Sequence, residues 1–386
     1  MNIFESDKKY IANTYNRFPV ELVAGKGSEL FDANGKRYLD MGSGIAVNIF
    51  GIADDDWCAA VTAQLTQLQH TSNLYYTDPC VTLAQKLCEK TGMKKVFFGN
   101  SGAEANEGAI KAARRYSVKK YGEGRNVIIT LKNSFHGRTL ATLAATGQDV
   151  FHHDFGPFPA GFVYAEPNDF TDVKTLCETN NVCAVMLEMI QGEGGVCPLE
   201  ADFVQSVADY CKANDLVLIV DEVQTGNGRT GALYAYMHYG IQPDIVTTAK
   251  GLGGGLPLGA VLLGEKCEFA LEAGTHGSTF GGNPVCCAGA ISILDRLTPQ
   301  LLAEVLKKSD YIVAELEQLP RVRSIAGKGL MLGIEFDRPG AEIAAACLEK
   351  GLLVLTAKNK VRLLPALNIP WDVLREAVDI LESCIA

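Results

Sequence analysis

Residues 216–231 read LVLIVDEVQTGNGRTG, in which five consecutive apolar residues end abruptly at the acidic pair Asp221 and Glu222. An uninterrupted apolar run of this length is typical of a strand that is buried on both faces, and such strands occur mainly in parallel sheets covered by helices. In sheets of this kind, ligands bind beyond the carboxyl ends of the strands. The segment therefore predicts an α/β fold and places the carboxylate of Asp221 at the ligand-binding edge of the sheet.

Short apolar runs alternate with helical patterns along the middle of the chain. Strands are expected at residues 95–98, 126–130, 183–187, 216–220, 244–248 and 259–263, and helices at residues 103–121, 139–146 and 201–214. Residues 21–40 instead predict a small antiparallel element with an Asn34-Gly35 turn. After residue 283 the sequence predicts long helices at 288–297 and 301–319 and strands at 330–336 and 352–355.

This order of elements predicts two domains. A chain of 386 residues exceeds what one hydrophobic core usually supports. We expect a large domain over residues 46–282, with a mainly parallel central sheet flanked by helices. A smaller α+β domain is expected from residues 1–45 together with residues 283–386.

The charge balance and the cysteine spacing exclude several classes of function. The chain carries 35 lysines and arginines against 45 aspartates and glutamates, and this net charge of −10 disfavours nucleic acid and anionic membranes as partners. The 12 cysteines include no C-x-x-C pair and the six histidines no H-x-x-x-H spacing, so no metal site is expected. No apolar run approaches the ~18 residues of a membrane span, and the first ten residues lack the apolar core of a secretion signal. We therefore expect a cytoplasmic protein that acts on small molecules.

The sequence has 39 glycines, against about 27 expected from average usage, and several of them follow one lysine. The segment TTAKGLGGGLPLGAVL, residues 247–262, places Lys250 where an apolar strand gives way to a glycine-rich loop. Burial at such a strand end lowers the pKa of a lysine amine, which then becomes a nucleophile able to form a Schiff base. A surface lysine in a flexible loop is the alternative. A nucleotide-binding loop is disfavoured because Leu256 breaks the G-x-G-x-x-G pattern.

Three further segments contain groups that could bind a phosphate, an aromatic ring and a carboxylate of a ligand. In GNSGAEANEGAIKAARRY, Ser101 and Gly102 precede an alanine-rich helix, and the free N–H groups of a helix start bind phosphate unless they serve only as an ordinary cap. In NSFHGRTLAT, Phe135 can stack on a ring, His136 supplies an imidazole, and Arg138 can grip a carboxylate. GSTFGGNP sets hydroxyl groups among glycines, where the backbone can approach an anion closely.

Together these segments describe one ligand. A phosphate site at a helix start, an aromatic ring for stacking, a carboxylate for a ring nitrogen and a lysine for an aldehyde are the features that bind pyridoxal 5′-phosphate. Five unrelated glycine turns are the alternative, and their joint occurrence by chance is far less probable than one cofactor site.

The sequence resembles the class III, fold-type I aminotransferases, and among them the acetylornithine aminotransferases of arginine biosynthesis. The resemblance covers nearly the whole chain. It rests on motifs that occur in a fixed order: NTYNRFPVELVAGKGSELFDANGKRYLD, SGIAVN, HTSNLYY, FFGNSGAEANEGAIK, NSFHGRTLATLAATGQ, LEMIQGEGGV, VDEVQTGNGRTG, PDIVTTAKGLGGG, GSTFGGNP, GKGLMLGIEF and VRLLP. The choice of subfamily depends mainly on NSFHGRTLATLAATGQ and on the length of the chain.

The resemblance implies a role for each matching residue. It makes Lys250 and Asp221 catalytic: Lys250 holds the cofactor aldehyde and Asp221 pairs with the pyridine nitrogen. Further cofactor contacts are implied for Ser101, Gly102, Ala103, Phe135, Val223, Gln224 and Thr279, and substrate contacts for Arg138, Glu193, Ser278 and Arg362. Thr279 is expected to reach the cofactor of the neighbouring subunit, so that the site is complete only in a homodimer.

The implied reaction is the transfer of an amino group from N2-acetyl-L-ornithine to 2-oxoglutarate, which gives N-acetyl-L-glutamate 5-semialdehyde and L-glutamate. Glu193 and Arg362 are expected to pair for one substrate and to separate for the other. Succinyldiaminopimelate, ornithine and 4-aminobutyrate remain open as amine donors, as does a non-catalytic binding protein that keeps the fold. The chain departs from the family at IFGIADDDW, residues 49–57, and at LLPALNI after Arg362.

Overall fold

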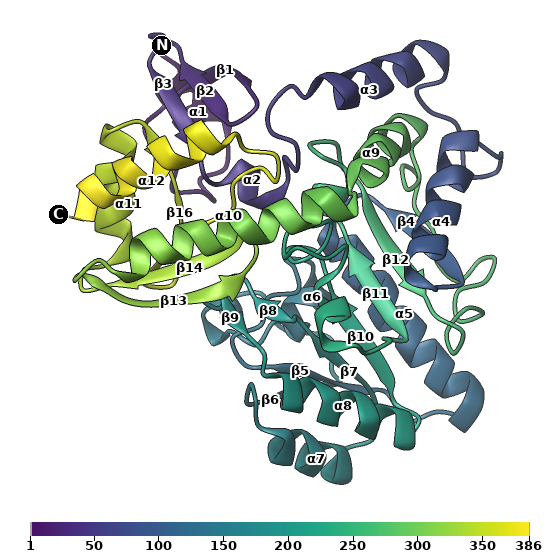
Figure 1. Cartoon of the computed structure of the whole chain (residues 1–386). Coiled ribbons are helices and arrows are strands. Elements are labelled where there is room, and N and C mark those ends of the chain that lie inside the picture. Colours follow the sequence, from purple (N-terminus) through teal and green to yellow (C-terminus); the bar gives the residue numbers. More distant parts are fainter. Residues whose placement is uncertain (1, 386) are drawn as a thin grey trace.

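The computed structural model describes residues 2–385 and is built around a seven-stranded sheet (Figure 1). Its strand order is β4-β12-β11-β10-β7-β5-β6, and within this sheet only β12 runs antiparallel to its neighbours. The strands are β4 Lys95–Gly99, β5 Val127–Leu131, β6 Phe162–Ala165, β7 Val182–Leu187, β10 Val217–Asp221, β11 Ile245–Thr248 and β12 Gly259–Leu263. This sheet, flanked by helices, confirms the predicted α/β fold class.

Both faces of the central sheet are covered, and alternate residues of each strand serve different faces. Val217 of β10 packs with the alanine-rich helix α5 (Gly102–Tyr121). Its neighbour Leu218 belongs to the cluster that includes the apolar residues of α8 (Ala201–Ala213). All five residues of β10 are buried, which explains why its sequence is a continuous apolar run rather than an alternating one.

The remaining helices lie around this sheet and in a second region at the two ends of the chain (Figure 1). They are α1 Ile3–Tyr10, α2 Ser43–Ala46, α3 Asp55–Gln67, α4 Asp78–Thr91, α6 Leu140–Ala145, α7 Phe170–Thr179, α9 Pro284–Arg296, α10 Pro299–Glu317, α11 Gly340–Glu349 and α12 Trp371–Ile385, with the short turns η1 Asp149–Phe151, η2 Ala235–Tyr239 and η3 Lys250–Leu252. No single helix within residues 2–385 is long and apolar enough to cross a membrane. The pair α9 and α10 passes that test only when joined, and it is bent by 76°. The cytoplasmic location stays a prediction.

Outside the central sheet lie two small four-stranded sheets, and in one of them the amino-terminal and carboxyl-terminal parts of the chain meet. One sheet has the order β1-β2-β3-β15, the other β13-β14-β17-β16, and a two-stranded ribbon joins β8 and β9. Their bounds are β1 Leu22–Lys26, β2 Glu29–Asp32, β3 Arg37–Asp40, β15 Leu352–Leu353, β13 Val322–Lys328, β14 Met331–Phe336, β17 Lys360–Leu363, β16 Leu355–Ala357, β8 Ile190–Gln191 and β9 Cys197–Pro198. The parallel pairing of β3 with β15 brings the purple and yellow ends of the chain together in Figure 1. The domain boundaries given above stay a prediction.

The unusual segment at residues 49–57 docks on the glycine-rich loop that follows Lys250. Asp54 caps α3 by accepting a hydrogen bond from the Trp57 N–H at 2.9 Å. The Trp57 indole Nε1 donates to the Gly253 carbonyl at 3.2 Å. A Cβ placed at Gly254 would lie 2.9 Å from that indole nitrogen, so the loop must be bare there for the tryptophan to fit.

Arg229 is a fully buried cation that joins the central sheet region to the carboxyl-terminal part of the chain. Its Nη1 donates to the carbonyls of Leu330, at 3.0 Å, and Pro365. Burial lowers the pKa of Arg229 to about 9, although the nearby charge of Asp40 opposes the effect. The arginine therefore stays charged at neutral pH and satisfies carbonyls that water does not reach.

Replacing Arg229 by Ala is expected to lower the free energy of unfolding by about 3 kcal/mol, because it leaves a cavity and two buried carbonyls without a donor. Urea denaturation followed by circular dichroism measures this change. The exposed Arg323 is the matched control, since its replacement by Ala should change stability by less than about 0.5 kcal/mol. Equal effects of the two substitutions would contradict the structural role given to Arg229.

Candidate active site

A cavity of about 240 Å³ lies where β5, β7, β10 and β11 end. Because these strands are parallel, the segments that follow them converge at one edge of the sheet. The cavity is lined by Gly102, Ala103, Asn106, Phe135, His136, Gly137, Arg138, Glu188, Asp221, Val223, Gln224 and Lys250. Nine of the residues singled out from the sequence, His136 among them, thus lie around one space.

Lys250 is the first residue of η3, the short turn between β11 and β12. Its backbone φ of 45° is left-handed, a conformation that a residue with a Cβ adopts at a cost and that is concentrated at functional sites. Burial lowers the pKa of the Lys250 amine, while the negative charge of Glu193 opposes this shift. A larger fraction of this amine is therefore unprotonated, and nucleophilic, than for a lysine in water.

Asp221 ends β10, and its carboxylate is oriented by three donors. Oδ2 accepts from Asn106 Nδ2 at 2.7 Å and lies 2.8 Å from His136 Nδ1, while Oδ1 accepts from the Val223 N–H at 3.0 Å. Burial alone would lower the pKa of His136, but the hydrogen bond and charge of Asp221 raise it overall. The carboxylate is fixed in one orientation and keeps unused acceptor capacity toward the cavity.

The segment after β5 carries an aromatic ring and a guanidinium to the cavity. Arg138 lies against two aromatic rings, with its Cζ 4.2 Å from the centroid of Phe151 and 5.5 Å from that of Phe135. Arg138 is exposed at the mouth of the cavity, whereas Phe135 is half-buried. Its charge is thus available to a carboxylate that enters from solvent.

The backbone at the start of α5 lies at one end of the cavity. Ser101 caps the helix by accepting a hydrogen bond from the Glu104 N–H at 3.1 Å. Gly102 and Ala103, the first helical residues, line the cavity itself. A Cβ at Gly102 would lie 2.7 Å from Val223 Cγ1, so only glycine leaves this approach open. The free N–H groups and the helix dipole make this end of the cavity suitable for a phosphate.

A buried ion pair stands beside the cavity. Arg362 Nη1 lies 2.6 Å from Glu193 Oε1 and donates to Gln224 Oε1 at 3.1 Å. Burial would raise the pKa of Glu193, but the Arg362 guanidinium outweighs it and holds the pKa below its usual value. The Arg362 side chain is 3 % exposed and that of Glu193 31 %, so the acid is the more accessible partner.

The structure separates the remaining sequence-based candidates from the cavity. Ser101, Ser278, Thr279, Glu193 and Arg362 do not line it. Ser278 accepts from Asn100 Nδ2 at 3.0 Å, close to the start of α5. Thr279 is exposed to solvent on the same loop.

Sequence reasoning missed three residues of the cavity wall, which are Asn106, Gly137 and Glu188. Asn106 lies four residues after Gly102 on the same face of α5, so helical spacing alone would have pointed to it. Glu188 follows the buried strand β7 as Asp221 ends β10, and the same pattern of an acid after an apolar run would have identified it.

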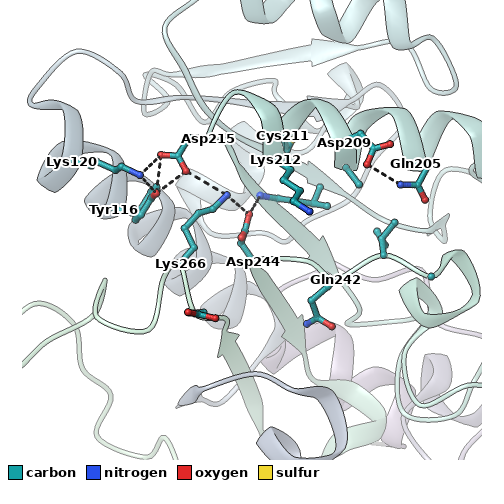
Figure 2. A pocket seen from close by; sticks show the side chains of 15 residues that line it. Tyr116, Lys120, Gln205, Asp209, Cys211, Lys212, Asp215, Gln242, Asp244 and Lys266 are labelled. Atoms are coloured by element: carbon teal, nitrogen blue, oxygen red, sulfur yellow. Dashed lines mark hydrogen bonds and ion pairs between the residues drawn. The ribbon is translucent and has the colours of Figure 1, made fainter.

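A larger hollow of about 670 Å³ lies at the opposite, amino-terminal ends of β10 and β11 (Figure 2). Two of its lysines pair with two of its carboxylates: Lys120 lies 2.8 Å from Asp215, and Lys266 lies 3.0 Å from Asp244. These lysines and carboxylates neutralise each other. The smaller cavity, in contrast, combines a nucleophilic amine, an oriented carboxylate, an aromatic ring and a helix start, and is the better candidate for catalysis.

Comparison with known proteins identifies the family of the chain. The family model "Aminotransferase class-III" matches residues 10–385. The acetylornithine aminotransferase of Haemophilus ducreyi is 52 % identical over 386 residues, which cover all of this chain and 98 % of that protein.

Two solved structures extend the comparison. The ornithine aminotransferase of Toxoplasma gondii, which holds PLP at its active site in partial occupancy, aligns with a TM-score of 0.93 and 31 % identity over 99 % of this chain and 93 % of that one. The N-acetylornithine aminotransferase of Stenotrophomonas maltophilia aligns with a TM-score of 0.86 and 34 % identity over 99 % and 98 % of the two chains. The family match covers nearly the whole sequence, so this chain belongs to the class III aminotransferases.

Proposed function

We propose that the chain uses pyridoxal 5′-phosphate to transfer the δ-amino group of N2-acetyl-L-ornithine to 2-oxoglutarate. The observation that carries the proposal is the buried amine of Lys250 in the same cavity as the oriented carboxylate of Asp221. Full-length relatives named acetylornithine aminotransferase support the choice of donor.

The side chains around the cavity fit this cofactor. The start of α5, at Gly102 and Ala103, suits the phosphate, and the Phe135 ring and Val223 suit the two faces of a flat ring. Asp221 retains acceptor capacity for a ring N–H. When bound, pyridoxal 5′-phosphate supplies an aldehyde that carries the amino group and a ring that withdraws electrons from the reacting carbon.

The chain's own residues then hold and move protons. Asp221 would pair with the ring nitrogen of the cofactor and favour its protonated form. The Lys250 amine, which its lowered pKa leaves unprotonated more often than a lysine in water, would be available to accept the proton released from the substrate carbon that bears the amino group. Arg138, at the mouth of the cavity, binds the substrate's α-carboxylate.

The two substrates place their carboxylates at different distances from the reacting nitrogen, and the Glu193–Arg362 pair provides a means of accommodating both. While Glu193 covers Arg362, as in this structure, the charge of Arg362 is neutralised and does not face the uncharged acyl chain of the donor. When Glu193 moves away, Arg362 becomes available to the second carboxylate of glutamate or 2-oxoglutarate.

We further propose that the active form is a homodimer in which Thr279 contacts the neighbouring subunit's cofactor. Leu74 and Tyr76 are 86 % and 98 % exposed, and Phe280 is 60 % exposed. Asn73 Nδ2 donates to the Ser278 and Gly281 carbonyls at 3.0 and 2.9 Å, so these apolar side chains share one surface with Thr279. A patch of large exposed apolar groups of this kind is typical of a protein interface.

The first prediction concerns the cofactor and the donor. Enzyme reconstituted with pyridoxal 5′-phosphate is expected to show visible absorbance that N-acetylornithine bleaches, whereas Lys250→Ala shows no such absorbance. Lys266→Ala, in the hollow of Figure 2, is the control and should behave as wild type. Absence of the absorbance in wild type would refute the cofactor assignment, and faster bleaching by succinyldiaminopimelate, ornithine or 4-aminobutyrate would reassign the donor.

The second prediction concerns the ion pair. Glu193→Ala leaves Arg362 uncovered, so the half-reaction with N-acetylornithine is expected to slow by about tenfold or more while that with glutamate changes by less than about threefold. Single-turnover absorbance measurements give the two rates separately. Glu349→Ala, at an exposed position, controls for the loss of a surface charge. Equal effects of Glu193→Ala on both half-reactions would rule out this role.

The third prediction concerns sharing of sites between subunits. Lys250→Ala and Thr279→Ala chains, unfolded and refolded together, should regain about a quarter of wild-type activity, because each mixed dimer then contains one intact site. Lys250→Ala mixed with Asp221→Ala should regain none, since both residues belong to the same cavity. If the Thr279→Ala mixture gains nothing over its separate components, the sites are not shared.

A further inference from the structure

Glu188 is a buried acid in the cavity wall that the proposed reaction leaves without a role. It is 6 % exposed and lines the cavity together with Lys250 and Asp221. A carboxylate is costly to bury unless nearby groups use its charge or its hydrogen-bonding capacity. Its position directly after β7 fixes it at the carboxyl edge of the sheet.

The Glu188 carboxylate binds the backbone of two segments of the site. Oε2 accepts from the Phe135 N–H at 2.9 Å, and Oε1 accepts from the Gly192 N–H at 3.4 Å. The first bond holds the residue whose ring forms a wall of the cavity. The second holds the start of the turn that carries Glu193.

Three titratable groups line the same cavity as Glu188, each from a different element. His136 comes from the segment after β5, Asp221 from β10 and Lys250 from η3. The neutral Asn106 of α5 joins two of them, because its Nδ2 donates both to Asp221 Oδ2 and to the His136 carbonyl. The His136 Nε2 atom is buried and has no hydrogen-bond partner among the described residues.

We propose that Glu188 is a positioning residue of the transamination site: it anchors the Phe135 backbone and supplies a negative charge beside His136 and Lys250. The inference rests on the proposed cofactor reaction. Through His136, which lies 2.8 Å from Asp221, this charge acts on the ring nitrogen, and through space it acts on the Lys250 nitrogen. Glu188 thus stabilises the protonated forms of the ring nitrogen and of the Lys250 nitrogen without touching the substrate.

The charges of the group agree with this role. Burial raises the pKa of Glu188 to about 7, with His136 opposing the shift and Asp221 adding to it. Burial acts to lower the pKa of both His136 and Lys250, and the negative charge of Glu188 opposes this effect at both groups. Above neutral pH, Glu188 is therefore ionised and its charge acts on both neighbours.

The test is a pH titration of the visible absorbance of the enzyme reconstituted with pyridoxal 5′-phosphate, without substrate. Glu188→Gln keeps the shape of the side chain and removes its charge, so the proton affinity of the chromophore is expected to fall about tenfold, a shift of about one pH unit. Glu188→Asp changes the shape and keeps the charge, and it should titrate within about 0.3 units of wild type.

Glu222→Gln is the matched control. Glu222 is also fully buried beside Asp221, but it accepts from the Tyr236 N–H at 2.8 Å and does not line the cavity. Its titration should coincide with that of wild type. A Glu188→Gln curve that coincides with wild type, or equal shifts in Glu188→Gln and Glu188→Asp, would overturn the inference. Failure of wild type to develop visible absorbance would instead refute the cofactor assignment itself.

Discussion

The burial of both faces of the central sheet is the constraint on which the rest of this structure depends. Every residue of β7 and β10 is buried, so neither strand has room for an exposed polar side chain along its length. Polar groups are therefore confined to the ends of the strands. Because β5, β7, β10 and β11 are parallel, their carboxyl ends deliver Phe135, Glu188, Asp221 and Lys250 to one edge. The active site is a consequence of how the sheet is covered.

Charges at this edge are stabilised by one another rather than by water. Asp221 is bonded to His136 and Asn106, and Asn106 Oδ1 in turn accepts from Thr247 Oγ1 at 2.7 Å. Such a network fixes each group in one orientation, although the buried His136 Nε2 has no partner among the described residues. The glycine-rich loop after Lys250 contributes in another way, since its bare backbone lets Trp57 pack against it. Orientation of the reactive groups is thus built into the folded chain.

The sequence predicts those parts of the fold in which local pattern and tertiary environment agree. The strand that ends at Asp221 is a continuous apolar run, and it lies close to where the sequence places it. The edge strand β6 escaped prediction because it is only partly buried and its pattern is weak. The conformation of the short helix α2 (Ser43–Ala46) could not be predicted from the sequence. All four of its residues have left-handed φ values, from 47° to 66°, although only one of them is glycine. Glu188 carried the same signal as Asp221, but no local pattern distinguishes an acid that faces the cavity from one, such as Glu222, that does not.

For the proposed opening of the Glu193–Arg362 pair, the exposure of the two side chains favours Glu193 as the partner that moves. Arg362 lies on β17 and its side chain is almost fully buried, so removing it from its place would disrupt the packing of that sheet. Glu193 lies in a turn beside two glycines and is about a third exposed, so water can solvate it when it leaves. The guanidinium would then be uncovered but not isolated, because Gln224 Oε1 still accepts from Arg362 Nη1. A retained neutral acceptor lowers the cost of exposing the cation while leaving its full charge for an incoming carboxylate. If the pair has the role proposed for it, Arg362 is hidden from an uncharged acyl chain while Glu193 covers it and is offered to a dicarboxylate once Glu193 moves away.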